Sequence, residues 1–478
     1  MRSSLSLAVL GSLVACVHAL SSALNCVSTT SKSGSIPLAS SGNVAPLFFA
    51  PNEWPAVQRA ANDFVTDIRR VTGLTGKLTN VTSTSTLTSQ IKNNVPVLIG
   101  TLGSSSLIDS VISHAGDAAK PFTAINGSWE AYHAQILSNP LPGVSQAYVI
   151  VGADRRGTMF ALYELSEQMG VSPWFWWADV PIKQSKSVFL TSTPCAHGSP
   201  TVKYRGIFLN DEQPALQNWA AEKFSNNFGG TAGTAVGGDA EFGAMDDPTK
   251  AASGTVAGAP FNRFFYTKLF ELMLRLKANY LWPAQWGSSF GVDDKLNQFW
   301  ADYYGIVMGT SHEEPMMRSI PNEWNEFGSG PWDFSANAAN ITQFWINGTK
   351  RAKGFEEIYT VGMRGNGDEP LSEGQDISLL ENVVEVQRNI ISQVYNITDV
   401  TKIPQVWTLY KEVEGFYDDG MRVEDDITLM WTDDNWGNIR RFPLPSERNR
   451  TGGSGVYYHV DYVGDPRDYK WIQVMLSF

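Results

Sequence analysis

The chain has 478 residues, of which 43% are hydrophobic and 12% aromatic, and its formal net charge at pH 7 is −12. This length is enough for two or three domains. A chain this acidic is poorly suited to bind nucleic acid, because its overall field repels phosphate. An anionic ligand would have to be held by local Arg and Lys side chains against that field.

Residues 1–19 have the pattern of a secretory signal peptide. Arg2 provides a positive charge, residues 5–17 are largely apolar, and residues 17–19 form a small-residue cleavage site. A membrane helix is the alternative, but the apolar run is too short to span a bilayer and no second one follows. We therefore expect cleavage near Leu20, a secreted, extracellular protein, and no membrane attachment after the signal is removed.

Two features of the remaining chain fit an oxidising compartment. Cys26 and Cys195 are the cysteines left after cleavage, and we expect a disulfide between them, with two unpaired buried thiols as the alternative. The acceptor pattern Asn-x-Ser/Thr occurs at Asn80, Asn126, Asn340, Asn347, Asn396 and Asn449. Together with the signal, these positions indicate a glycoprotein.

Residues 20–182 alternate between strand-like and helix-like segments. Apolar residues recur at helical spacing in residues 54–71 and 156–169, whereas residues 95–100 and 148–152 are short buried strands. This alternation predicts a small N-terminal α/β domain.

Residues 183–200 are rich in Ser, Thr and Pro, and we interpret them as a linker. Residues 201–478 then repeat strand-then-helix units without hairpin signals, which predicts a (β/α)8-type (TIM) barrel as the catalytic domain. The strand-like runs are residues 204–209, 279–282, 305–309, 358–363, 405–409, 427–431 and 455–459. Seven runs leave the barrel incomplete, lacking its last strand; either the sequence is a fragment, which we favour, or another element closes the gap.

The active site of such a barrel lies at the C-terminal ends of its strands. After every expected strand the sequence places a carboxylate, His, Arg or Trp side chain. These segments are residues 210–212, 283–286, 311–314, 364–369, 410–412, 433–436 and 459–462. Their convergence predicts a functional rim, because a surface rim without a function would show scattered polar residues.

The chemistry that such a rim supports is glycosidic bond cleavage. That reaction needs one carboxylic acid to protonate the leaving oxygen and one carboxylate to activate water or attack carbon. The candidates are Asp211, Glu212, Asp368, Glu412, Asp433 and Asp434, each of which, taken alone, is more often a solvated or ion-paired carboxylate. A metal site at His312, Glu313 and Glu314 is the rival interpretation. No second clustered His supports it, so we expect no metal and no cofactor.

Seven segments of the sequence resemble glycoside hydrolase family 115. They are residues 204–212 (YRGIFLNDE), 274–283 (LRLKANYLWP), 308–316 (MGTSHEEPM), 360–368 (TVGMRGNGD), 410–413 (YKEV), 431–438 (WTDDNWGN) and 457–464 (YYHVDYVG). The resemblance runs from the small N-terminal domain to about Trp471, and long motifs in the right order make it specific.

The resemblance implies a xylan α-1,2-glucuronidase that removes glucuronic acid, or its 4-O-methyl form, from xylan side chains with inversion. It implies that Asp368 and Glu412 are the catalytic carboxylates, with the choice of acid and base left open. It implies a uronic-acid pocket lined by Asn210, Asp211, Trp286, His312, Arg364, Asn435, His459 and Tyr462. The expected partners are glucuronoxylan or its oligosaccharides, and both a monomer and a homo-oligomer remain open. Members of the family continue through a last barrel strand, a helical domain and a β-rich domain, which this sequence does not include.

Two other functions remain open. The first is a non-catalytic carbohydrate-binding remnant of such an enzyme, and the second is a barrel glycosidase with another sugar specificity, such as a hexosaminidase. Arg364 and Lys411 near the expected pocket favour an anionic sugar, because the guanidinium fork of Arg matches a carboxylate. The alternative role of both cations is ion pairing with the candidate carboxylates.

Overall fold

The computed structural model describes residues 25–91, 94–209, 215–225, 259–285, 287–367, 369–371, 377–410, 412–434 and 438–459. The chain divides into two compact units. The first consists of Met1–Arg205 and Phe270–Asn279, and the second of Gly206–Leu269 and Tyr280–Phe478. The division therefore falls after Arg205 rather than within residues 183–200, and a short later segment belongs to the first unit. Each unit is described by itself.

The first unit is an α/β domain. Its strands are β1 (Val27–Ser28), β2 (Ile36–Ser40), β3 (Asn43–Val44), β4 (Leu47–Phe49), β5 (Leu78–Asn80), β6 (Val97–Thr101), β7 (Tyr132–Leu141), β8 (Val144–Gly152), β9 (Val188–Leu190) and β10 (Cys195–His197). Its helices are α2 (Pro55–Thr72), α3 (Thr84–Ile91), α4 (Ser106–Ala115), η1 (Gly116–Ala119), α5 (Lys120–Thr123) and α6 (Arg155–Met169). In addition, α9 (Arg263–Arg275) contributes its last turns to this unit.

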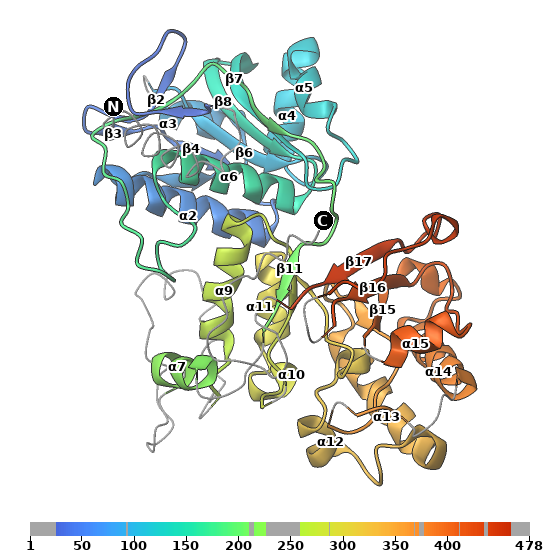
Figure 1. Cartoon of the computed structure of the whole chain (residues 1–478). Helices are drawn as coiled ribbons and strands as arrows, with labels where there is room; N and C mark the ends of the chain where they lie inside the picture. The colour runs from blue at the N-terminus through green and yellow to red at the C-terminus, as the bar shows by residue number, and fades with distance from the viewer. Residues whose placement is uncertain are drawn as a thin grey trace, which may run out of the picture. The chain divides into compact units, whose positions relative to one another are not determined.

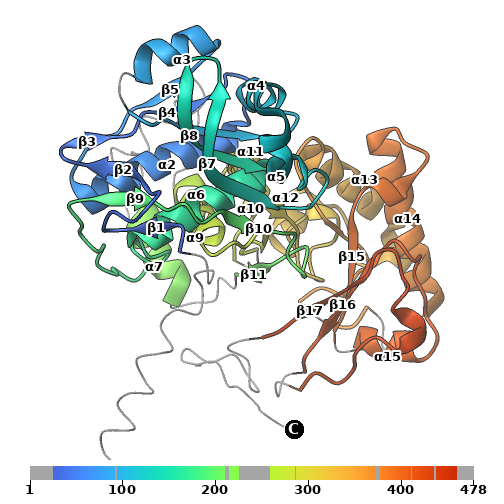
Figure 2. The ribbon, with the colours of Figure 1, turned by 90° about the horizontal axis from the view of Figure 1, so that it is seen from above.

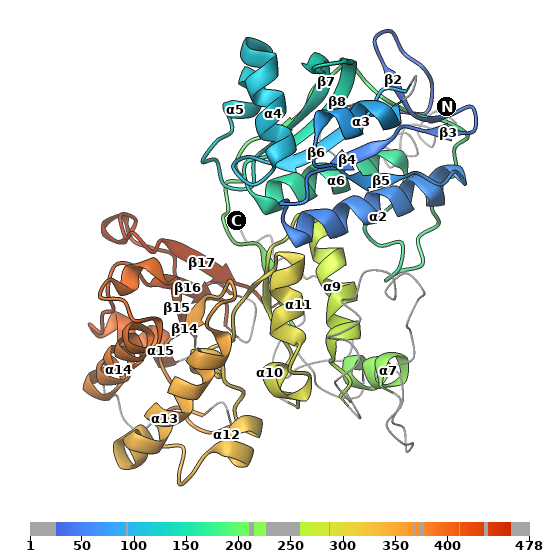
Figure 3. The ribbon, with the colours of Figure 1, turned by 180° about the vertical axis from the view of Figure 1, so that it is seen from behind.

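A mixed sheet in the order β10-β7-β8-β6-β4-β5 forms the centre of this unit. Side chains alternate between the two faces of a strand, so Phe48, Leu98 and Val149 share one face. They form a buried cluster with Leu107 of α4 and Phe122 of α5. The opposite face is covered by α2 and α6, which pack against each other (Figure 3). Helices on both faces explain why residues 97–99 of β6 and 147–151 of β8 are apolar without interruption rather than alternating.

The structure adds two features to the sequence-based expectation for this unit. Residues 183–200 are not only a linker, because β9 pairs with β1 and β2, and β10 pairs with β7. The strand β8 is also the second half of an antiparallel hairpin with β7. The apolar residues Val188 and Leu190 of β9 are fully buried, which gives this Ser-rich segment a reason to join the sheet.

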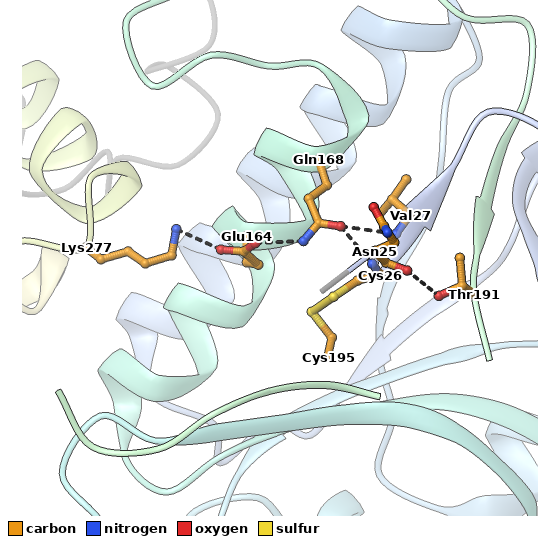
Figure 4. The surroundings of a disulfide bond; sticks show 8 residues. All are labelled: Asn25, Cys26, Val27, Glu164, Gln168, Thr191, Cys195 and Lys277. Carbon is orange, nitrogen blue, oxygen red and sulfur yellow. Dashed lines mark hydrogen bonds and ion pairs between the residues drawn. A yellow bond between two sulfur atoms is a disulfide. The ribbon is translucent and has the colours of Figure 1, made fainter. Parts of the chain in front are cut away.

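A disulfide fastens the N-terminal strand to this unit. Cys26 and Cys195 are bonded, with their Cα atoms 5.4 Å apart. Gln168 of α6 accepts hydrogen bonds from the backbone N–H groups of Cys26, at 2.8 Å, and Val27, at 3.2 Å (Figure 4). The same Gln168 side chain donates to Glu164 at 2.7 Å, so α6 holds the strand through one amide.

Buried charges join α2 to the last turn of α9. Asp67 of α2 is fully buried, and its two carboxylate oxygens accept from Arg275 at 2.9 and 3.3 Å. Arg70 donates to the same carboxylate at 2.9 Å, and Glu271 accepts from the Nε of Arg275 at 2.8 Å. A buried carboxylate is costly without such partners, so this ion pair accounts for the place of residues 270–279 in the first unit.

The second unit combines short parallel strands with longer helices. Its strands are β11 (Gly206–Phe208), β12 (Tyr280–Trp282), β13 (Val307–Met308), β14 (Tyr359–Thr360), β15 (Gln405–Leu409), β16 (Thr428–Thr432) and β17 (Ser454–Tyr457). Its helices, besides the first turns of α9, are α7 (Ala215–Phe224), α10 (Phe290–Asp293), α11 (Asn297–Tyr304), η2 (Pro315–Met317), α12 (Asn322–Phe327), α13 (Phe334–Ala352), α14 (Ile377–Tyr395), η3 (Val400–Lys402), α15 (Glu412–Asp418) and η4 (Pro445–Glu447). The helices α13, α14 and α15 flank the strands β14 to β17 (Figure 1).

The strands of the second unit are parallel and follow one another in chain order. One sheet has the order β11-β12-β13 and the other β14-β15-β16-β17. The neighbours β15, β16 and β17 of the second sheet can be followed in Figure 2. A parallel bridge between Met308 and Glu357 links the two sheets. At the two ends of this series, the rings of Phe208 on β11 and Tyr457 on β17 lie 5.7 Å apart. The described residues thus show the expected parallel strand-helix pattern, but they do not show a closed barrel.

Glu357 is an unusual residue of this series. Glu357 stands two positions before the first residue of β14 and is 5% exposed. Neither of its carboxyl oxygens has a hydrogen-bond partner among the described residues. Burial raises the pKa of Glu357 well above its ordinary value, and the nearby Asp302 raises it further, while Arg351 opposes the shift. The neutral acid is therefore the form that the folded protein accommodates.

We expect Glu357→Gln to stabilise the protein above about pH 4.5. The folded state holds the Glu357 proton to a higher pH than the unfolded state, whose pKa is near 4.5. Stability conferred by the neutral acid is therefore complete below this pH and is lost as the pH rises through the folded-state pKa. Between about pH 4.5 and the folded-state pKa, the increase in the free energy of unfolding caused by Glu357→Gln should grow by up to about 1.4 kcal/mol per pH unit. Urea unfolding of both proteins at pH 4, 6 and 8 measures this difference.

Glu385→Gln on the exposed face of α14 is the matched control, and its effect on stability should be small at every pH. A gain for Glu357→Gln that is equal at pH 4 and pH 8 would contradict the raised pKa.

Candidate active site

The described residues include four of the ten predicted catalytic and substrate-binding residues. These are His312 after β13, Arg364 after β14, Glu412 after β15 and His459 after β17. The other six, which are Asn210, Asp211, Trp286, Asp368, Asn435 and Tyr462, lie outside the described residues.

The register of the strands brings their C-terminal ends to one edge. Thr360 of β14 is the partner of Val406, Leu409 of β15 is the partner of Trp431, and Thr432 of β16 is the partner of Tyr457. Parallel strands all end on the same side of a sheet, so the residues that follow them share that side. This is the local reason why side chains far apart in the sequence meet here.

Arg364 and Glu412 form a two-point ion pair at this edge. The Nε of Arg364 donates to Oε1 of Glu412 at 3.0 Å, and Nη2 donates to Oε2 at 3.0 Å. Arg364 is buried, whereas the Glu412 side chain is 21% exposed. The paired geometry fixes the plane of the carboxylate and leaves Glu412 partly accessible, as a carboxylate that acts on a ligand requires.

The backbone around Arg364 is held on both sides. The indole N–H of Trp332 donates to the Arg364 carbonyl at 2.9 Å. Gln387 of α14 accepts from the Gly362 N–H and donates to the Gly362 carbonyl, both at 2.7 Å. Gly362 has a φ of +96°, and a Cβ there would lie 3.0 Å from the ring of Trp407, so this turn requires glycine. The guanidinium is thus placed by rigid neighbours rather than by a free loop.

His312 lies on a loop that its own side chains stabilise. Ser311 donates to the carboxylate of Glu314 at 2.5 Å, and Thr310 donates to the Glu314 carbonyl at 2.6 Å. Met316 and Met317, which follow, are buried and have positive φ values of 58° and 64°. Two consecutive left-handed residues with side chains are strained, and such strain persists only where the surroundings impose it.

His459 is bound to Asp433, which follows the neighbouring strand β16. The Nδ1 of His459 lies 2.5 Å from Oδ1 of Asp433, and the backbone N–H of His459 donates to the same oxygen at 3.1 Å. Asp433 is 1% exposed. A carboxylate that accepts from an imidazole N–H fixes both the orientation and the tautomer of the ring.

Tyr410 connects the two histidines. Its ring centre lies 5.0 Å from that of His312 and 5.4 Å from that of His459. The ring centre of Tyr457 lies 4.3 Å from that of His459. These ring contacts join the ends of β13, β15 and β17 into one aromatic cluster, in which Tyr410 and His312 are buried.

Two further carboxyl groups also follow β15 and β16, Glu414 on α15 and Asp434 after β16. Burial raises the pKa of Glu414 on α15, and the cations Arg440 and Arg441 oppose the shift. Asp434 accepts from the backbone and side-chain amides of Asn438 at 2.9 and 3.2 Å and so shapes the turn after β16. Neither arrangement resembles the Arg364–Glu412 pair.

The sequence alone did not identify Tyr410, Tyr457 or Glu414 as members of the site, and it treated Asp433 only as a spare catalytic carboxylate. Tyr410 stands directly before Lys411 and Glu412, so its position at a strand end was the available signal. In the part of the chain that the structure describes, no group of three or more His, Cys, Asp or Glu residues could hold a metal ion.

A carboxylate held by Arg, and imidazole and aromatic rings, follow neighbouring parallel strands here, and these are side-chain types that binding sites and glycosidases use. Residues 197–477 match the family described as glycosyl hydrolase family 115. The chain belongs to this family of glycosidases, as its motifs predicted. A search of curated proteins found no match.

Comparison with solved structures finds a member of the same family. A family GH115 4-O-methyl-α-glucuronidase, BtGH115A, with specificity for decorated arabinogalactans, is 32% identical to this chain, with a TM-score of 0.72. The match covers 89% of this chain and 50% of that chain, so this chain spans about half the length of the matched protein.

Two hexosaminidases match far more weakly. The N-acetyl-β-hexosaminidase of Streptomyces plicatus is 9% identical, with a TM-score of 0.44 and coverage of 88% of this chain and 72% of that chain. The GH20 exo-β-N-acetylglucosaminidase of Vibrio harveyi is 10% identical, with a TM-score of 0.39 and coverage of 86% and 57%. Neither match carries an argument about this chain.

We expect Arg364→Ala to reduce kcat/KM for glycoside hydrolysis by a factor equivalent to about 2–5 kcal/mol, because it leaves Glu412 without its charge partner. Arg364→Lys should recover only part of the loss, since an ammonium group cannot make the two-point contact. Steady-state kinetics measure both. Arg448→Ala at an exposed position of the same unit is the control. Activity within a few-fold of wild type in Arg364→Ala would show that the ion pair is structural.

Proposed function

We propose that this chain contributes the catalytic centre of an inverting glucuronidase. The substrate would be xylan that carries glucuronic acid, or its 4-O-methyl form, through α-1,2 linkages. The observation that carries this proposal is the ion pair of Arg364 with Glu412, at the ends of neighbouring strands in a member of glycosyl hydrolase family 115. The 4-O-methyl-α-glucuronidase named among the matched structures supports a uronic acid as the sugar removed.

Two carboxyl groups would carry out the reaction. Glu412 begins α15 directly after β15, and Asp368 follows β14, the neighbouring strand. Side chains from adjacent strand ends face one pocket, so one carboxyl group would protonate the leaving oxygen while the other activates water. Inversion requires a spacing of roughly 6.5–9.5 Å between them, which leaves room for that water. Both carboxyl groups have the chemistry for either role.

Local positive charge would offset the acidic character of the chain. The formal charge of −12 repels an anionic sugar at long range. Arg364 is buried beside Glu412, and a buried guanidinium interacts more strongly with an anion than an exposed one does. A uronic acid is therefore better suited to this site than a neutral sugar.

The strands of the second unit support a (β/α)8 barrel as the frame of this site. They are parallel, follow chain order and alternate with helices, and the rings of β11 and β17 meet at Phe208 and Tyr457. This is the strand order of a TIM barrel, whose active sites lie at the strand ends used here.

A second polysaccharide is a specific alternative substrate. The matched glucuronidase is described as specific for decorated arabinogalactans. The uronic acid that is removed would then be the same, and the main chain to which it is attached would differ. Parallel assays with glucuronoxylan and with an arabinogalactan that carries glucuronic acid separate the two substrates.

Inversion can be tested by the anomer that is released first. Because the substrate is α-linked, proton NMR should show β-glucuronic acid first, with the α-anomer appearing only by mutarotation. Glu412→Gln and Asp368→Asn should each abolish most turnover, because an amide neither donates a catalytic proton nor acts as a base.

An initial α product would contradict inversion. Near-normal rates in either variant would move the role to Asp434 or Asp211. Binding of the oligosaccharide without any release of uronic acid would favour the carbohydrate-binding alternative.

We also propose that the protein is secreted and N-glycosylated. The signal pattern of residues 1–19 supports export, and the disulfide between Cys26 and Cys195 suits an oxidising compartment. All six acceptor asparagines are exposed: Asn80, Asn126, Asn340, Asn347, Asn396 and Asn449. Among the described helices, none is long and apolar enough to cross a membrane.

Glycosylation predicts a measurable change in mass. Protein secreted by a eukaryotic host should lose mass on treatment with an amidase that removes N-glycans, and each occupied asparagine should become aspartate in peptide mass spectra. Asn340 and Asn347 are seven residues apart on α13, so both glycans would project from one face of this helix. Replacing either residue by Gln should remove one glycan and leave the other. Unmodified peptides at all six positions would contradict the proposal.

A further inference from the structure

The contact between Asp433 and His459 is well defined, and the proposed reaction gives it no role. The two residues follow the neighbouring strands β16 and β17, and Thr432 is the partner of Tyr457 in the register of these strands. One carboxylate oxygen, Oδ1 of Asp433, lies 2.5 Å from the Nδ1 of His459 and 3.1 Å from the backbone nitrogen of the same residue. A single oxygen thus binds both the ring and the backbone of His459.

This geometry constrains where the ring proton lies. The oxygen already accepts the backbone N–H of His459, so it is an acceptor in this contact. A carboxylate oxygen that also accepts from Nδ1 requires the proton to be on Nδ1. If the ring turned by 180°, a carbon would replace Nδ1 and the hydrogen bond would be lost.

Packing reinforces this orientation. The rings of Tyr457 and Tyr410 lie 4.3 and 5.4 Å from the His459 ring, and the His459 side chain is 11% exposed. Contact with two tyrosine rings restricts rotation of the imidazole about its side-chain bonds. His459 therefore has a fixed plane and a fixed donor nitrogen, together with a small accessible area.

Asp433 itself is badly placed to act on a substrate. It is 1% exposed, and its second oxygen, Oδ2, is buried without a hydrogen-bond partner among the described residues. Glu412, by comparison, has a side chain that is 21% exposed. Asp433 can therefore influence a ligand through His459 rather than by direct contact.

We propose that Asp433 is a positioning residue that holds the proton of His459 on Nδ1, so that Nε2 is the nitrogen which His459 presents to the substrate. In the neutral ring Nε2 accepts a hydrogen bond, as from a sugar hydroxyl group, and in the protonated ring it donates one. The role of Nε2 toward a sugar rests on the proposed function, whereas the position of the proton rests on the contact with Asp433 alone.

The position of the proton can be measured without any substrate. The chain contains six histidines, and selective ¹⁵N labelling with a His459→Gln variant identifies the signals of this ring. In the wild-type protein at a pH where the ring is neutral, we expect a protonated Nδ1 and an unprotonated Nε2. A proton on Nε2 would overturn the proposal. Because the measurement is made on the wild-type protein, it does not depend on whether a variant of Asp433 folds.

Asp433→Leu tests the cause of this arrangement, because leucine has a similar size but no acceptor atom. Without the carboxylate oxygen nothing holds the proton on Nδ1, so a share of the rings should carry it on Nε2 and the two nitrogen signals should move toward each other. Asp434→Leu, one residue further along the same loop, is the matched control, because Asp434 bonds to Asn438 instead. An unchanged His459 spectrum in Asp433→Leu, or an equal change in Asp434→Leu, would overturn the assignment of Asp433.

The kinetic measurement separates this inference from the proposed function. If uronic acid is released by the wild-type protein, Asp433→Leu should lower kcat by about 10²- to 10⁴-fold, as expected when an imidazole loses the residue that fixes its tautomer. A fall of less than a few-fold, together with a changed tautomer, would overturn the role in positioning toward the substrate. If the wild-type protein releases no uronic acid, the proposed function fails, and the NMR result still decides whether Asp433 sets the tautomer.

Discussion

Parallel pairing of β14, β15, β16 and β17 in chain order is the constraint on which the site depends. Each strand hydrogen-bonds to the next one in the sequence, and every one of them ends on the same side. Arg364, Glu412, Asp433 and His459 come immediately or shortly after these four strands. The backbone hydrogen bonds between these strands therefore bring the four chain segments to one edge, whichever side chains the segments carry.

In the described part of the chain, buried ionisable groups are paired at the C-terminal ends of these strands, whereas the one before β14 is not. After the strands, Arg364 and Asp433 are almost fully buried, and each has a partner at hydrogen-bond distance, Glu412 and His459 respectively. Before β14, Glu357 is buried with no such partner among the described residues, and burial raises its pKa. A buried charge must be paired or neutralised, and the protein pairs charges where the site lies and tolerates a neutral acid where it does not.

The sequence predicted the repeating strands of the second unit well, because short apolar runs followed by helical patterns have a strong local signal. It also predicted that polar residues after those runs would gather. It did not predict which side chains bind each other. Arg364 and Glu412 are 48 positions apart, and Asp433 and His459 are 26 apart, and no local pattern records such pairs. In the first unit, the Ser- and Pro-rich composition of residues 183–200 predicted a linker. The strands β9 and β10 form there because they pair with strands that are distant in the sequence, which local composition does not indicate.

The ion pair of Arg364 with Glu412 also bears on how one site can hold an anion beside a catalytic carboxylate. A uronic acid would bring a second negative charge close to Glu412, and two carboxylates in a partly buried site repel each other strongly. Arg364 offers five N–H donors in one plane, of which Nε and Nη2 bind Glu412. Its positive charge is delocalised over the whole guanidinium group, so it lowers the repulsion for any anion bound nearby, whichever atoms make the contact. The buried cation thus both balances the charge of the Glu412 carboxylate and allows an acidic sugar to bind nearby. A change at Arg364 should therefore affect catalysis and the choice of sugar together.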